Sequence, residues 1–164
     1  IGITRFFEST TLSWISLNVF ITVILLFFIY ILEVEYHVDN HKTGVTGNGA
    51  NYFHYLILFG LSFITISFEI VGGNETNMHY TAFIFYFGFT LMLVGVLLMT
   101  HYNKHEFSVN KCQIILISIT LICAYLFEYY SHASALLRSS VCMLSVGLIL
   151  AIQWYAPKLQ KKTL

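Results

Sequence analysis

Five apolar stretches, each about as long as a bilayer is thick, alternate with shorter polar segments along this chain. At a rise of about 1.5 Å per residue, a helix of roughly 20 apolar residues crosses the hydrocarbon core of a membrane. The pattern therefore predicts an all-α polytopic membrane protein, with a single transmembrane domain over residues 1–164. The expected spans are residues 12–33, 52–71, 79–102, 112–130 and 136–155.

The connecting segments are short, which predicts that successive spans are antiparallel neighbours in an up-and-down bundle. Lysine and arginine are unequally divided between the two sides, and positive residues favour the cytoplasmic one. We therefore expect the N-terminal end outside and the C-terminus in the cytoplasm. An outside start at Ile1, which is not Met, suggests a fragment preceded by an odd number of spans. The side rich in positive charge holds Lys42, Lys104, Lys111, Lys158, Lys161 and Lys162, and the other holds Arg5 and Arg138.

Composition supports a membrane location. The 164 residues are 57% hydrophobic and 10% charged, whereas roughly 25% of residues are charged in soluble domains. The zero net charge argues against a nucleic-acid partner. The expected partners are the lipid bilayer, and other membrane subunits or further copies of this chain. Three cysteines without a CxxC pair predict neither a disulfide framework nor a zinc site, and no hydrolase, P-loop or dinucleotide-binding motif argues for an enzyme.

Residues 52–71 carry a polar stripe. His54, Ser62, Thr65 and Glu69 fall on roughly one face of a helix, because their offsets fit a period of 3.6 residues. Polar side chains are costly against lipid, so we expect this face to point into the bundle.

Two other spans also place residues of one kind on one helix face, polar residues in the first span and glycines in the third. Asn18, Thr22 and Glu33 lie close to one face of the first span. Such side chains serve either helix packing, through interhelical hydrogen bonds, or a polar site inside the membrane. Gly88 and Gly95 are seven residues apart in the third span, so they share a face that can admit a close neighbour.

The ionisable side chains of the spans sort by depth into two layers. Two pairings are expected: Glu33 with His54, and Glu69 or Glu128 with a histidine of the outer layer. One interpretation is a proton or ion path between the layers. The other is that these side chains reach interfacial water from the span ends. The cytoplasmic layer holds Glu33, His54 and His101, and the outer layer holds Glu69, His79, Glu128 and His132.

Histidines raise two further hypotheses. His37 and His41 have the spacing of helical metal ligands, but three glycines follow in residues 35–51, so we expect a solvated loop and no metal site. Histidines at equal depth on facing helices can instead ligate a b-type haem. The two candidate pairs are His54 with His101 and His79 with His132.

The order of features resembles the C-terminal half of the bacterial low-temperature-requirement A (LtrA) membrane proteins. In that family an aromatic-acidic span end, a polar loop, a helix opening with a Tyr-x-His-like start and a glycine-containing helix follow one another. The resemblance implies a multi-pass bacterial inner-membrane protein, and it assigns no catalytic residue. It rests on Phe28, Ile29, Tyr30, Glu33, Tyr52, Phe53, His54, Tyr55, Gly60, Tyr86, Gly88 and residues 93–95.

Three functions follow from these patterns. The first is transport or sensing through inward carboxylates and histidines, in an LtrA-like protein of the bacterial inner membrane. The second is a non-catalytic subunit of a larger membrane complex, such as a respiratory or ATP synthase assembly of an organellar inner membrane. The third is a haem-binding electron carrier. The residues to test are Asn18, Glu33, His54, Glu69 and Glu128.

Overall fold

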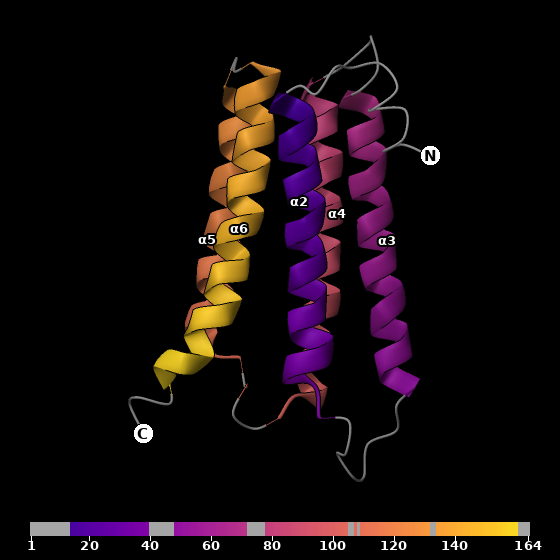
Figure 1. Cartoon of the computed structure of the whole chain (residues 1–164), viewed down its shortest axis with the longest axis vertical. Coiled ribbons are helices and arrows are strands. Elements are labelled where there is room, and N and C mark those ends of the chain that lie inside the picture. Colours follow the sequence, from indigo (N-terminus) through magenta and orange to yellow (C-terminus); the bar gives the residue numbers. More distant parts are fainter. Residues whose placement is uncertain are drawn as a thin grey trace.

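The computed structural model describes residues 14–39, 48–71, 78–104, 107, 109–131 and 134–160. Five long helices run through this part of the chain with nearly parallel axes (Figure 1). Each is long and apolar enough to cross a membrane, which confirms the predicted all-helical, multi-pass architecture. They are α2 (Trp14–Ile31), α3 (Asn48–Val71), α4 (Met78–Met99), α5 (Lys111–Tyr130) and α6 (Ala135–Gln160).

Helix α4 lies at the centre of the packing. It contacts α3 most extensively and also contacts α5, while α6 packs against both α2 and α5. The apolar core formed by α2, α4 and α6 includes the fully buried side chains of Ile29, Phe89, Met92, Val146 and Ile149. A helix enclosed on several sides is apolar around most of its circumference, as the sequence of α4 is.

Glycines set the close approach of α3 and α4. A Cβ atom added at Gly88 would lie 2.7 Å from the Gly60 carbonyl oxygen, and one at Gly95 would lie 3.0 Å from the Phe53 carbonyl oxygen. The predicted shared face of Gly88 and Gly95 therefore does admit a close neighbour. Gly60 supplies the matching gap on α3, where an added Cβ would lie 2.6 Å from the Gly88 carbonyl oxygen.

The loop predicted for residues 35–51 is wrong at both ends. The first span continues as a π-helix, η1 (Leu32–His37), and α3 already begins at Asn48. Val38 N donates to the Glu33 carbonyl oxygen at 3.1 Å, five residues back, as the wider π-turn requires. His37 is therefore in a buried helix and not in a solvated loop. Residues 40–47, with His41, lie outside the described residues.

Candidate functional site

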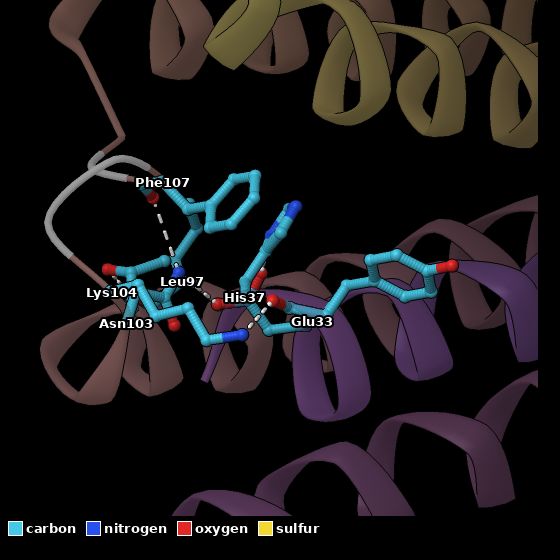
Figure 2. Close-up of polar contacts among 8 residues, drawn as sticks. Glu33, His37, Leu97, Asn103, Lys104 and Phe107 are labelled. Atoms are coloured by element: carbon cyan, nitrogen blue, oxygen red, sulfur yellow. Dashed lines mark hydrogen bonds and ion pairs between the residues drawn. The ribbon is translucent and has the colours of Figure 1, made fainter. Parts of the chain in front are cut away.

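A buried polar cluster closes one end of the bundle, where α2 and α4 both end. The Glu33 carboxylate accepts from His37 Nδ1 at Oε2 and from Asn103 Nδ2 at Oε1, each at 2.8 Å. Figure 2 shows these contacts as dashed lines. All three side chains are at most 7% exposed. A carboxylate at this depth is retained only with such partners.

Backbone pairing holds this cluster together. Val38 and Asn103 form an isolated antiparallel bridge, and Lys104 N donates to the His37 carbonyl oxygen at 2.9 Å. The Phe107 ring stacks on the His37 ring, with centroids 4.6 Å apart. Residues that follow α4 and the short 3-10 turn η2 (Thr100–Tyr102) are thereby fixed against the end of α2.

The predicted pairing of Glu33 with His54 is wrong. His54 Nδ1 lies 2.9 Å from the Ala50 carbonyl oxygen, and its Nε2 lies 3.1 Å from the Tyr30 hydroxyl. In the neutral ring, Nδ1–H donates to the carbonyl, so Nε2 accepts from Tyr30. The histidine partner of Glu33 is His37 in the same helical segment, because η1 extends the first span as far as His37, four residues after Glu33.

A second buried carboxylate lies near the opposite end of the bundle. Glu128 on α5 is 3% exposed, and it accepts from the Tyr86 hydroxyl at 2.9 Å and from the Cys142 thiol at 3.1 Å. Among the described residues, both contacts use Oε1 of the carboxylate. Since α5 rises about 1.5 Å per residue, Glu128 is roughly 22 Å from Gln113 at the other end of this helix.

The sequence predicts that Glu69 or Glu128 pairs with His79 or His132, and among the described residues Glu128 contacts Tyr86 and Cys142. His79 is exposed, and its ring packs near that of Tyr129, with centroids 4.9 Å apart. His132 lies outside the described residues. Tyr86 and Cys142 were missed because nothing in the local pattern separates a buried tyrosine or cysteine of a span from its apolar neighbours.

A cavity of about 120 Å³ adjoins Glu128. It lies where α2, α3, α4 and α6 approach α5, and it brings Glu128 and Arg138 into one site. Arg138 Nη2 donates to the Ser131 carbonyl oxygen at 2.7 Å, which holds the guanidinium at the start of α6. The polar lining is Thr22, Ser67, Thr81, Glu128, Arg138, Ser139 and Cys142, and the apolar lining includes Val19, Phe68, Val71, Ala82 and Phe85.

Asn18 ties α2 to α6 beside this cavity. Its Nδ2 donates to the hydroxyl oxygens of Ser139 and Ser140 at 3.0 and 2.9 Å. Among the described residues, Thr22 bonds only within its own helix, where its hydroxyl donates to the Asn18 carbonyl oxygen at 2.7 Å. Asn18 thus has the helix-packing role expected of polar side chains in membranes, while Thr22 lines the cavity.

The inward orientation predicted for the polar stripe of α3 is wrong. Ser62, Thr65 and Glu69 are exposed on the outside of the bundle, and His54 is half-buried. Gly60 determines which face of α3 meets α4, so Ile57, Ile64 and Phe68 are buried instead. The hydroxyls of Ser62 and Thr65 donate to carbonyl oxygens four residues back at 2.9 Å, which satisfies them without a partner helix.

The haem hypothesis depends on ring nitrogens that can reach iron. Both nitrogens of His54 already have hydrogen-bond partners, and the side chain of His101 is exposed, with its ring against Tyr102. In the described part of the chain, no group of three or more metal-binding side chains gathers. To ligate a haem through Nε2, His54 would have to give up its contact with the Tyr30 hydroxyl, whereas its Nδ1 contact with the Ala50 carbonyl oxygen is of the kind that ligating histidines keep.

No protein-family model, curated protein or solved structure matches this chain. The resemblance to the LtrA family therefore stays a prediction.

Proposed function

We propose that this protein binds a small polar molecule in the cavity between Glu128 and Arg138, and that this binding serves transport or sensing across the membrane. The observation that carries the proposal is the meeting of a buried carboxylate and a guanidinium at one cavity of about 120 Å³ inside a bundle of spans. Ionisable side chains within membrane spans are costly, and they mark substrate or ion sites by default.

The hydrogen-bonding capacity of the lining restricts the ligand. The hydroxyl of Thr22 donates to Asn18 and that of Ser67 donates to Ile64, both to backbone carbonyls at 2.7 Å. Toward the cavity, these hydroxyls therefore offer lone pairs. With the carboxylate of Glu128, they suit a ligand that carries N–H or O–H donors, while Arg138 suits an acceptor or anionic group.

The apolar walls of the cavity suit a compact organic body between those polar ends. Pockets for small molecules are generally apolar with a few placed polar groups, and here Phe68, Val71 and Phe85 supply that wall. We therefore favour a small zwitterion, such as an amino acid, as the ligand class.

Transport would require a change in helix packing. Between the Glu128 cavity and the Glu33 cluster, the centre of the bundle is filled by Ile29, Phe89, Met92 and Val146, each 0% exposed. A ligand in the cavity thus meets an apolar barrier in this conformation, and it crosses only if helices move apart. Sensing needs only that occupancy shifts the packing of α5 and α6 around Glu128. Both roles fit an LtrA-like protein of the bacterial inner membrane.

Ligand-dependent stabilisation of the purified chain tests this proposal. The protein in detergent is heated with a panel of amino acids, small amines, carboxylates and polyols, and its melting temperature is read from intrinsic fluorescence. We expect amino acids to raise the melting temperature in a saturable way, because a ligand that binds only the folded state stabilises it. Glu128→Gln should abolish the rise, and Glu69→Gln, which removes an exposed carboxylate, should preserve it. A panel without any saturable response would contradict the proposal.

A structural subunit is the second candidate, and two apolar grooves favour it. One groove of about 410 Å³ lies between α2 and α3, and another of about 430 Å³ lies between α2 and α6. Each is wide enough to receive side chains of a partner helix. Native mass measurement separates the candidates: stoichiometric partners beside the 18.8 kDa chain favour a subunit, and a chain that runs alone or as a homo-oligomer favours transport or sensing.

A further inference from the structure

We propose that the small pocket beside Glu33 binds one monovalent cation of about the size of Na⁺. This pocket lies at the opposite end of α5 from Glu128, and its volume is about 10 Å³, which is room for about one water-sized sphere. Its polar lining comes from η1, η2, α5 and α6, through Glu33, His37, Thr100, Gln113 and Gln153.

The side-chain oxygen of Gln153, which lines the pocket, indicates that a ligand binds there. Gln153 is only 7% exposed, and its buried Oε1 has no hydrogen-bond partner among the described residues. Outside the pocket lining, Oδ1 of Asn103, whose amide nitrogen donates to Glu33, is also buried without a partner among the described residues. Buried polar atoms in native proteins are nearly always satisfied, and exceptions mark an ion or a water.

Three groups that line the pocket carry oxygen lone pairs: the Glu33 carboxylate, Gln153 Oε1 and the Thr100 hydroxyl. The Thr100 hydroxyl donates to the Leu97 carbonyl oxygen at 2.6 Å, so it presents lone pairs elsewhere. Hard oxygen ligands of this kind, carboxylate, amide carbonyl and hydroxyl, are those that hard cations prefer.

Charge and helix dipoles favour a single positive charge. Glu33 is the one carboxylate that lines the pocket in the described part of the chain. The C-terminal ends of two helical segments, η1 at His37 and η2 at Tyr102, meet beside it, and the negative ends of helix dipoles attract cations. One carboxylate with neutral oxygen ligands balances a monovalent ion and leaves a divalent ion undercompensated.

A cation at this position would join four segments of the bundle. Glu33 belongs to the end of the first span, Thr100 to the end of the third, Gln113 to the start of α5 and Gln153 to α6. The bound ion is therefore expected to stabilise this end of the protein, independently of any ligand in the Glu128 cavity.

A cation titration tests the site. The purified chain in detergent is heated in mixtures of NaCl and choline chloride at constant ionic strength, because the choline ion is far too large for the pocket. Tryptophan fluorescence reports unfolding, and Trp154 adjoins Gln153 in the chain. We expect a saturable rise in melting temperature with Na⁺, of about 3–6 °C at tenfold excess over the dissociation constant.

Four variants locate the response. Glu33→Gln and Gln153→Met should each abolish the rise caused by Na⁺, because the first removes the charge and the second removes the unpaired oxygen. The matched control Glu69→Gln should keep the full rise, and so should Glu128→Gln, which disables only the other cavity. The change on adding Na⁺ is compared within each protein, so a variant that is less stable still gives an answer.

The proposal is overturned if the melting temperature is equal in NaCl and choline chloride at every concentration. It is also overturned if Glu33→Gln and Gln153→Met respond to Na⁺ as fully as the unaltered chain does. The first result would assign the pocket to a structural water, and the second would place the cation elsewhere.

Discussion

Replacing Gly60 by alanine should force α3 and α4 apart. An added Cβ would lie 2.5 Å from Met92 N, 2.6 Å from the Gly88 carbonyl oxygen and 2.8 Å from Met92 Cα, whereas ordinary contact begins at 3.4 Å. All three neighbours are backbone atoms, so no side-chain rotation relieves the clash. The shortfall of up to about 0.9 Å has to be met by separation of the most extensive helix pair in the bundle.

The expected loss of stability follows from two opposed effects. Overpacking of this kind costs about 1–3 kcal/mol, and in a rigid backbone contact we take the upper part of that range. The greater helix propensity of alanine returns about 1 kcal/mol. The net loss is about 2 kcal/mol, which corresponds to a melting temperature about 4–8 °C lower for a chain of this length.

Gly147→Ala is the matched control. Among the described residues, its added Cβ meets only Leu25 Cδ1, at an ordinary 3.7 Å, so the propensity gain should appear without a clash. Both variants are compared by thermal unfolding in one detergent, monitored by helical circular dichroism. The reasoning is refuted if Gly60→Ala melts as high as Gly147→Ala, because that result would mean that α3 does not approach α4 through Gly60.

Three further substitutions probe the polar contacts. Asn103→Leu should destabilise the chain by about 1–3 kcal/mol, because it leaves Oε1 of the buried Glu33 without its donor. Chemical unfolding measures this loss, and an unchanged midpoint would contradict the hydrogen bond between Asn103 and Glu33. Asn18→Leu should cost only about 0.6 kcal/mol, the average for interhelical hydrogen bonds in membranes, and a loss several times larger in the same assay would assign Asn18 more than packing. Ser62→Ala should change the free energy of unfolding by less than about 0.5 kcal/mol, since among the described residues its exposed hydroxyl bonds only within its own helix. A clear loss of stability would indicate that the polar stripe of α3 faces into the bundle after all.

The spans were predictable because length and hydropathy alone decide them. A stretch of about 20 apolar residues has few alternatives to crossing a bilayer, and the five predicted spans coincide with the five helices to within a few residues. The closeness of Gly88 and Gly95 to a neighbour was predictable for a similar reason, since residues seven apart share a helix face. Both inferences depend on one helix at a time.

Partner choice was not predictable, because it depends on how helices are rotated against one another. The close contact at Gly60 sets the rotation of α3, so that its polar stripe faces outward. No periodicity in residues 52–71 predicts that rotation. Glu128 meets Tyr86 and Cys142, 42 and 14 residues away, through the packing of three helices. The contact of His37 with Glu33 was not predicted for a local reason. The polar residues after Glu33 have the composition of a loop, whereas the chain continues there as the π-helix η1.

Chemical access to Cys142 tests the central claim, that a small polar molecule can occupy the cavity between Glu128 and Arg138. Cys142 lines that cavity, and Cys112→Ala with Cys123→Ala removes the two other thiols. The folded protein is treated with a small ammonium-bearing methanethiosulfonate and with a neutral one, and labelling is followed by intact mass. We predict that both reagents label Cys142, that amino acids found to stabilise the chain protect it, and that Glu128→Gln lowers the ammonium-to-neutral rate ratio several-fold. A Cys142 that reacts only after unfolding would show that the cavity admits no such molecule, and would contradict the account.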